Sequence, residues 1–353
     1  MTDSSIRFDR RSLVKTLGAG AVAATAGCAG DDDGDAGDDG DTGDDGDTAG
    51  DADVEFTIAS TFEPGHILVE TAEMFKEHAE DESDGDIAVD ISAGGAFGSE
   101  DEIGEIVSQG GVEAHVAGSF PYFQFAPEYW FFGCPFVIPD YDQLISVLES
   151  DQMQEAHDTL RENGNQRPMG QQVYRGARNF TSNTPVRTPA DVSDLDLRLS
   201  ELDPWVTIWE EVGATATPVA LDELYSALET GTVNASEGGA EQISSFNLNE
   251  VQTHLSLTEH LIANGNLYMN EEFFQGVDET YQDILLEAGQ EATEEAAAIS
   301  MEREADLIDE LAAEGMEVVD DVDQDAFQEA AEPAVNQLFD DTWAFDWDTV
   351  LSM

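Results

Sequence analysis

Strand-like and helix-like segments alternate early in the chain, and this order limits the folds that are open to it. Apolar and polar side chains alternate, as in strands, over residues 54–59, 87–91 and 112–117. Between them, residues 67–80 and 100–108 carry apolar side chains at helical spacing. Because strands joined through helices run parallel, this order predicts an α/β fold with a mostly parallel sheet and helices on both faces.

The ends of these strands predict where a ligand would bind. In parallel α/β sheets, ligands bind beyond the carboxyl ends of the strands. Ser60 directly follows the first predicted strand, and Ser119 and Phe120 follow the third. We therefore expect Ser60, Ser119 and Phe120 to lie at a cleft.

A second group of predicted elements follows Gly176. Residues 197–199 predict a short strand, residues 204–212 a helix, and residues 263–270 a strand that returns to the first group. Residues 279–314 are rich in alanine and glutamate and predict one long helix. The chain after the N-terminal segment is long enough for two α/β lobes.

Short motifs follow one another in a fixed order through the middle of the chain. Each is only a few residues long, but their order and spacing are specific when they are taken together. They are Gly176-Ala177-Arg178-Asn179-Phe180-Thr181-Ser182, Leu197-Arg198-Leu199, Val212-Gly213-Ala214-Thr215-Ala216-Thr217-Pro218, Glu223-Leu224-Tyr225 with Gly231-Thr232-Val233-Asn234, and Glu250-Val251-Gln252.

This series resembles the extracytoplasmic solute-binding subunits of TRAP (tripartite ATP-independent periplasmic) transporters, over roughly residues 54–350. The resemblance implies a two-lobed periplasmic-binding-protein-like fold, with a ligand cleft between the lobes and a long C-terminal helix that spans them. It also implies a protein that captures an organic acid and delivers it to ion-coupled permease subunits in the membrane. No cofactor, metal, nucleic acid or enzymatic activity is expected.

The predicted organisation has four parts. Residues 1–27 form an export signal and residues 28–53 an acidic tether. Lobe I is expected to comprise residues 54–175 plus about 264–303. Lobe II is expected to comprise residues 176–263 plus about 304–353.

Arg198 is the main candidate for ligand binding. In the family that the chain resembles, the arginine of the Leu-Arg-Leu strand pairs with the ligand carboxylate. A planar guanidinium suits this role because it donates two parallel hydrogen bonds to a carboxylate. Arg178 is expected to support the same carboxylate or to fix Arg198, while Arg175 fits the family pattern less well. The alternative for each arginine is a structural ion pair.

Glu237 and Gly238 correspond to a family motif that ends in Glu-Asn-Pro. Glu237 matches the motif, but Gly238 replaces an asparagine that contacts the ligand in relatives. We expect this replacement to remove one hydrogen bond and to widen the pocket. Phe120 and Trp205 are candidates to line the pocket, with core packing as the alternative. His66 is expected to pack at a helix start or to contact the ligand.

Acidic residues dominate the composition and exclude a whole class of partner. The chain holds 78 Asp and Glu against 12 Lys and Arg, for a formal charge of −66. The acids are spread along the chain, which indicates adaptation to high salt, where the Debye length is only about 3 Å at 1 M. Without a basic patch to contact phosphates, nucleic-acid binding is excluded.

The N-terminus indicates export and anchoring. Arg10-Arg11 precedes a short run of small and apolar residues, as in a twin-arginine signal. Thr25-Ala26-Gly27-Cys28 resembles a lipobox, so Cys28 is expected to carry a lipid that holds the protein on the outer face of the cell membrane. The alternative is a signal that stays uncleaved.

Several alternatives stay open. Nucleophile-elbow, zinc-protease, P-loop and dinucleotide motifs are absent from the sequence, yet a surface enzyme acting on a carboxylated substrate is the runner-up. A sensory binding subunit is the third interpretation. The acidic run at Asp321, Asp323 and Asp325 has the outline of a calcium loop, but Ala326 stands where that loop needs glycine, so a helix cap is expected. The sequence leaves open which carboxylate binds and which oligomer forms.

Overall fold

The computed structural model describes residues 52–353, apart from the side chain of Asp222. The predicted export signal, Cys28 and nearly all of the acidic tether lie outside the described residues. Over the described part of the chain, no helix combines the length and the apolar character needed to cross a bilayer.

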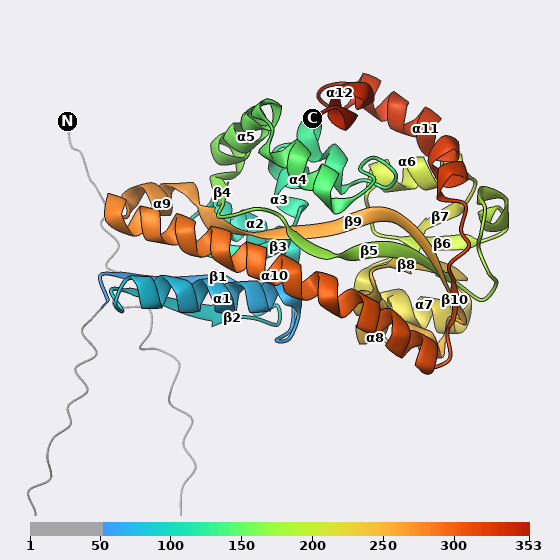
Figure 1. Ribbon diagram of the computed structural model, residues 1–353, viewed down its shortest axis with the longest axis horizontal. Coiled ribbons are helices and arrows are strands. Elements are labelled where there is room, and N and C mark those ends of the chain that lie inside the picture. The colour runs from blue at the N-terminus through green and yellow to red at the C-terminus, as the bar shows by residue number, and fades with distance from the viewer. Residues whose placement is uncertain (1–51) are drawn as a thin grey trace, which may run out of the picture. The chain divides into compact units, whose positions relative to one another are not determined.

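Within residues 52–353, ten strands form one mixed sheet (Figure 1). Its main path runs β2-β1-β3-β9-β5-β8-β6-β7, and β4 and β10 each pair with β9. The strands are β1 (Val54–Ala59), β2 (Ile87–Ser92), β3 (Ala114–Gly118), β4 (Gln166–Pro168), β5 (Val173–Ser182), β6 (Asp196–Leu199), β7 (Thr215–Pro218), β8 (Ala235–Gly238), β9 (His254–Asn270) and β10 (Glu317–Val319).

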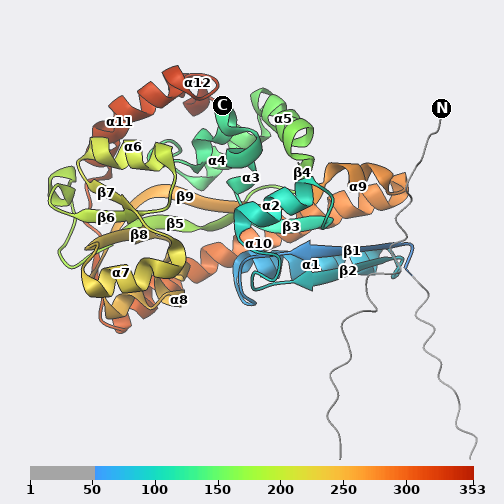
Figure 2. The same cartoon turned by 180° about the vertical axis from the view of Figure 1, so that it is seen from behind.

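Helices flank this sheet in both views (Figures 1 and 2). They are α1 (Ile67–Glu82), α2 (Glu100–Ser108), α3 (Phe120–Phe125), α4 (Tyr141–Glu149), α5 (Gln154–Gly164), α6 (Asp203–Val212), α7 (Leu224–Thr230), α8 (Ala240–Ser245), α9 (Glu271–Gly276), α10 (Glu279–Ala313), α11 (Gln324–Asp341) and α12 (Trp347–Leu351).

The sheet is parallel at its two ends and antiparallel in its centre. β1 runs parallel to β2 and β3, and β6 runs parallel to β7 and β8. β9 runs antiparallel to β3 and β5, and β5 runs antiparallel to β8. The prediction of a mostly parallel sheet therefore holds for the strands at each end of the sheet and is wrong for the central strands. The two long central strands pass between the lobes in opposite directions, which makes their mutual pairing antiparallel.

Separate apolar cores support the two lobes. In lobe I, Phe56, Leu68 and Phe75 pack with the second half of β9 and with Leu285 and Ala288 of α10. In lobe II, a smaller core joins α7, α8 and the end of α10. A third cluster lies between α3, α4, α6 and α11.

α10 confirms the prediction of one long helix. It has 35 residues, about 50 Å at 1.5 Å per residue. It packs against α1 near its start and against β5 and α8 further along, so it spans both lobes (Figures 1 and 2).

The C-terminal segment follows the expected cap. Asp323 accepts a hydrogen bond from the backbone N–H of Ala326 at 3.1 Å and begins α11. Asp321 instead pairs with Arg187. α11 packs on α6, and α12 packs on α4.

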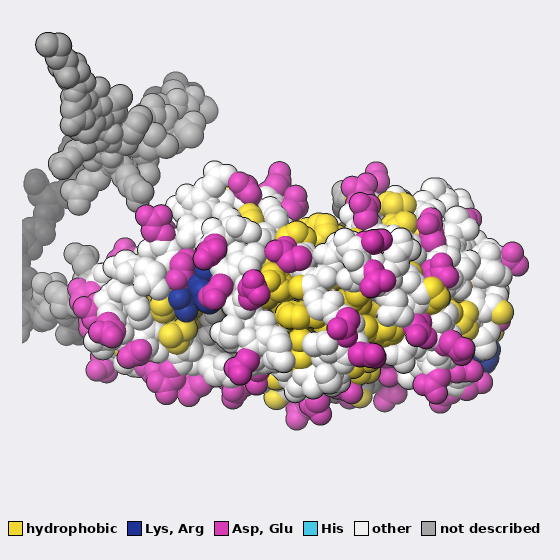
Figure 3. All heavy atoms as spheres, turned by 90° about the horizontal axis from the view of Figure 1, so that it is seen from above, with side chains coloured by type: hydrophobic (Ala, Val, Ile, Leu, Met, Phe, Trp, Pro, Cys, Tyr) yellow, Lys and Arg dark blue, Asp and Glu magenta, His cyan; other side chains and the backbone are white. Residues whose placement is uncertain are grey.

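On the face that carries α11 and α12, acidic side chains are spread rather than gathered in a patch (Figure 3). Figure 3 shows them scattered across the face that carries α11 and α12, with few basic side chains among them. This distribution agrees with the even spread of acids along the sequence.

Candidate functional site

A cavity of about 700 Å³ lies between the lobes. Its lobe I wall comes from the segments that follow β1 and β3, and its lobe II wall from β6, α6 and α8. The central strands β5 and β9 contribute the residues where the two walls meet. The volume is in the range of small-molecule sites, about 300–1,000 Å³.

Three arginines reach this cavity. Arg175 and Arg178 come from β5 and Arg198 comes from β6. Only eight Lys and Arg residues follow Cys28 in the whole chain, so three of the eight line one cavity. In so acidic a protein, this concentration of cations indicates a site for an anion.

Arg198 is a buried cation without a counter-ion in the described chain. Its side chain is fully enclosed, with 1% of the residue exposed, and its Nε donates to the carbonyl oxygen of Val219 at 2.8 Å. Among the described residues, a set that leaves out the side chain of Asp222, no carboxylate forms an ion pair with it, and its two terminal nitrogens have no hydrogen-bond partner. Burial lowers the pKa of Arg198, and the nearby Glu237 opposes that shift. Its free donors therefore suit a carboxylate that enters the cavity.

Arg178, in contrast, is already paired. Its Nε lies 2.5 Å from Glu237 Oε2 and its Nη2 lies 2.7 Å from Glu237 Oε1, a two-point contact. Glu237 is fully buried, and His260 Nε2 lies 3.3 Å from the same carboxylate. Although burial raises the pKa of Glu237, Arg178 and His260 together hold that pKa below its ordinary value. The guanidinium of Arg178 stacks over Trp205, 5.1 Å from the ring centroid.

Arg175, which fits the family pattern less well than Arg178, also lines the cavity. Its guanidinium lies 4.9 Å from the centroid of Phe62, and its Nη1 contacts the carbonyl oxygen of Asn264 at 3.5 Å. Burial lowers the pKa of Arg175, while the charges of Glu100 and Glu241 raise it. Glycine at position 176 was the one signal in the sequence that the strand is irregular here.

His66 begins α1 at the edge of the cavity. Its Nδ1 accepts from the backbone N–H of Leu68 at 3.1 Å, and its ring stacks on Phe62 with 4.0 Å between centroids. Burial, and then the charge of Arg175, lower the pKa of His66 to about 2, so the ring is neutral at pH 7. Its Nε2 lies 3.6 Å from Glu241 Oε2, which brings a lobe I residue against lobe II. His66 therefore packs at the helix start and also lines the cavity.

The structure brings five of the eight predicted ligand-binding residues to the cavity. Those five are Arg178, Arg198, Ser119, Phe120 and Trp205.

The other three lie behind the cavity. Ser60 is buried, and its Oγ accepts from the backbone N–H of Phe62 at 3.0 Å, which shapes the loop after β1. Glu237 holds Arg178 from behind. Gly238 pairs with Asn179 inside the sheet, and a Cβ there would lie 3.1 Å from Gln242 Nε2. The side chain of Gln242 therefore occupies the space that we expected Gly238 to leave open.

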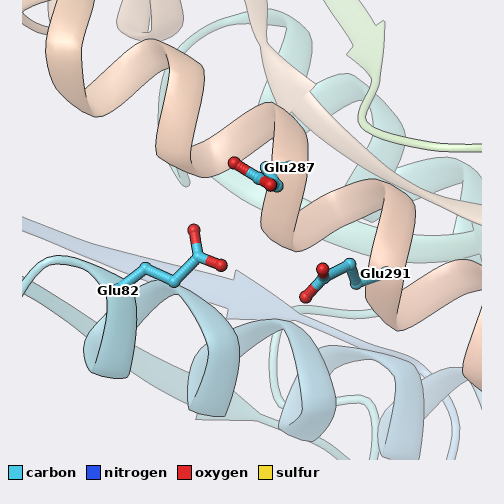
Figure 4. A group of neighbouring side chains, drawn as sticks. All are labelled: Glu82, Glu287 and Glu291. Carbon is cyan, nitrogen blue, oxygen red and sulfur yellow. The ribbon is translucent and has the colours of Figure 1, made fainter.

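An acidic cluster lies away from the cavity. Glu82 of α1 and Glu287 and Glu291 of α10 direct their carboxylates toward one another (Figure 4). A partial loss of solvation between the two helices, followed by the charges of Glu287 and Glu291, raises the pKa of Glu82. All three side chains are exposed, and exposed acidic groups alone do not make a metal site.

Comparison with known proteins identifies the family. Residues 58–342 match the profile of DctP, described as bacterial extracellular solute-binding protein, family 7. The chain belongs to this family.

Relatives of this solute-binding protein agree in sequence and fold. It is 28% identical over 286 residues to a solute-binding protein of Roseobacter denitrificans, covering 79% of this chain and 87% of the relative. A Roseobacter denitrificans TRAP periplasmic solute-binding protein with bound L-galactonate superposes with a TM-score of 0.75 and 25% identity, over 86% of this chain and 99% of that one. A Sulfitobacter TRAP periplasmic solute-binding protein with bound β-D-galacturonate superposes with a TM-score of 0.76 and 25% identity. The match covers 84% of this chain and 98% of that one.

These comparisons confirm the predicted fold class. The protein has the two-lobed fold of TRAP periplasmic solute-binding proteins, with the long helix α10. Its relatives are binding proteins rather than enzymes.

Proposed function

We propose that this protein is the extracytoplasmic binding subunit of a TRAP transporter and that it captures a hydroxylated organic acid, such as a sugar acid. The observation that carries the proposal is Arg198, a buried guanidinium in the cavity wall that has no counter-ion among the described residues. A buried charge without a partner is costly unless a ligand supplies one.

The roles of the three arginines follow from their surroundings. Arg198 binds the ligand carboxylate through its two free terminal nitrogens. Arg178, already neutralised by Glu237, adds a fixed hydrogen-bond donor beside it. Arg175 has both Glu100 and Glu241 as neighbours, so its end of the cavity is not a strong site for a second carboxylate.

The rest of the lining favours hydroxyl groups and one apolar face. Ser119, Glu241, Gln242, Ser245 and Asn264 offer donors and acceptors along the wall. Phe120 and Trp205 add aromatic surface for the carbon chain. Such a mixture suits a chain of hydroxylated carbons. The relatives that hold L-galactonate and β-D-galacturonate support this class.

Ligand capture is proposed to close the lobes. β5, β9 and α10 connect the lobes, while Arg198 and His66 approach the cavity from opposite sides. A ligand that contacts both walls shifts the population toward the closed form. The closed form then delivers the acid to the permease subunits. The lipid on Cys28 would hold the protein at the outer face of the membrane, in a high-salt setting.

A thermal-shift screen tests the proposal. We would heat the full chain in molar salt with L-galactonate, D-galacturonate, D-glucuronate and succinate, and with galactose and galactitol as neutral controls. A ligand at 100 times its Kd stabilises the folded state by about 2.7 kcal/mol. Stabilisation by hydroxylated acids alone, absent in Arg198→Ala, is the expected result. No stabilisation by any acid, with the protein folded, would contradict the assignment.

A further inference from the structure

β5 carries an irregularity between two of the three cavity arginines. Tyr174 pairs with Asn264 of β9, and Ala177 pairs with Ile262. The chain therefore advances three residues on β5 while it advances two on β9, which defines a β-bulge at Arg175 and Gly176. Gly176 has φ +89°, a conformation that glycine adopts without strain.

The bulge decides which way the arginines face. In a regular strand, residues three apart lie on opposite faces of the sheet, because successive side chains alternate. Arg175 and Arg178 are three apart, yet both line the same cavity. One extra residue reverses the alternation. Without the bulge, only one of the two arginines would face the ligand.

Glu304 of α10 contacts both ends of this bulge. Its Oε1 accepts from the backbone N–H of Ala177 at 2.7 Å, and its Oε2 accepts from the hydroxyl of Tyr174 at 2.6 Å. A Cβ on residue 176 would lie 3.1 Å from Glu304 Oε1, so the carboxylate sits directly over Gly176. Hydrogen bonds to a charged acceptor are among the stronger ones in proteins.

The same turn of α10 also contacts lobe I. Arg303, the preceding residue, pairs with Glu70 of α1 at 2.7 Å. The position of Glu304 over the strand is therefore fixed from two directions, by the sheet and by α1.

We propose that Glu304 is a positioning residue of the binding site: it holds the β5 bulge that turns Arg175 into the cavity beside Arg178. Its effect on affinity rests on the proposed function. Its effect on the bulge does not, because the two hydrogen bonds exist without a ligand.

Three substitutions separate this role from a general structural one. Glu304→Ala removes both hydrogen bonds. Glu304→Gln keeps an oxygen for the N–H of Ala177, and its amide can donate to the hydroxyl of Tyr174, so both contacts survive. Glu302→Ala changes an exposed neighbour on α10 and is the matched control. Because Glu304 is itself partly exposed, we expect all three variants to fold.

The first readout is backbone amide exchange in the ligand-free full chain. In Glu304→Ala the N–H of Ala177 loses its acceptor and should exchange at least roughly tenfold faster than in wild type, since a hydrogen bond to a charged group contributes on that scale. Glu302→Ala should retain the wild-type protection, and Glu304→Gln, whose neutral oxygen still accepts from the N–H of Ala177, should retain most of it. Unchanged protection of Ala177 in Glu304→Ala would overturn the proposal.

The second readout is calorimetry with L-galactonate and D-glucuronate. Glu304→Ala should bind at least about tenfold more weakly, while Glu304→Gln should restore wild-type affinity. Tyr174→Phe, which removes one of the two contacts, should fall between them. Equal weakening in Glu304→Ala and Glu304→Gln would indicate that the charge matters rather than the bulge, and would overturn the positioning role.

The two readouts also separate the two proposals. If wild type binds neither acid, the proposed ligand class fails, and amide exchange at Ala177 still decides whether Glu304 holds the bulge. If wild type binds but Glu304→Ala binds equally well, the positioning role fails and the ligand class stands.

Discussion

Arg178 and Glu237 share two hydrogen bonds beside the cavity, whereas Arg198, on β6 next to the strand of Glu237, has no counter-ion among the described residues. The two arginines therefore have different roles. Arg178 is held in place before any ligand arrives. Arg198 retains free donors, and the nearby Glu237 is already paired with Arg178, so Arg198 is the group that would gain most from a carboxylate.

Replacing Arg198 by alanine should weaken binding of the acid that stabilises the wild type most by about 2–5 kcal/mol, the usual cost of truncating one partner of a buried charge pair. Isothermal titration calorimetry measures the change. Arg187→Ala, on an exposed arginine that pairs with Asp321, is the control and should bind like wild type. A loss smaller than tenfold, about 1.4 kcal/mol, would remove Arg198 from its central role.

Replacing Glu237 by glutamine should lower stability by about 3–5 kcal/mol at neutral pH, because it leaves Arg178 beside a buried neutral amide. The pKa of Glu237 is lower in the folded state than in the unfolded state. Its contribution is therefore complete above the unfolded-state value of 4.5 and is lost as the pH falls through the folded-state pKa.

Urea denaturation of wild type and Glu237→Gln at pH 7 and at about pH 3 measures this difference. The difference in free energy of unfolding between the two proteins should be smaller at pH 3 than at pH 7. A gap that stays constant with pH would show that the carboxylate charge of Glu237 does not stabilise the fold.

His66 should make the fold sensitive to mild acid. Its pKa is about 2 in the folded state against 6.5 for a free histidine, so below pH 6.5 the unfolded state binds the extra proton. The contribution of His66 to the free energy of unfolding is thus complete above pH 6.5. It falls, by at most about 1.4 kcal/mol per pH unit, as the solution is acidified.

His66→Asn keeps a side-chain acceptor at the start of α1 and removes the titration. Its stability should decline less between pH 6.5 and 4.5 than that of wild type, as measured by chemical denaturation. Parallel declines in the two proteins would exclude His66 as the source.

Cys28→Ser should release the protein into the growth medium, because the predicted lipid attachment is lost. Fractionation of cells followed by immunodetection measures where the protein is found. Retention on the membrane at the wild-type level would argue for an uncleaved signal instead of a lipid.

Local patterns predicted the elements of the fold well, but not how its centre is arranged. The alanine- and glutamate-rich composition indicated α10 within a residue of its ends, and the Leu-Arg-Leu strand is present as β6. The direction of β5 and β9 was not predicted, because pairing between residues some 80 positions apart leaves no local pattern. β9 also runs unbroken from His254 to Asn270, where the sequence analysis recognised only its second half.

The site was predicted in part for the same reason. Arg178 and Arg198 lie in motifs, and both reach the cavity. Arg175 was ranked below them because it fits the family pattern less well, and nothing local in the sequence shows that a bulge brings it to the same face as Arg178. Gly238 was expected to enlarge the pocket, but Gln242, from the helix that follows, covers it.

The lobes share three long connections, β5, β9 and α10. Two lobes joined by three connections that run side by side can bend toward each other about one axis. A twist of one lobe against the other would instead stretch some connections and compress others. The closure proposed above would therefore follow a single path. Since Arg175 and Arg178 stand on one of those connections, any bending of β5 also moves two of the side chains that line the cavity. The positions of these two arginines and the angle between the lobes would then change together. A ligand too short to reach both walls would leave the lobes apart.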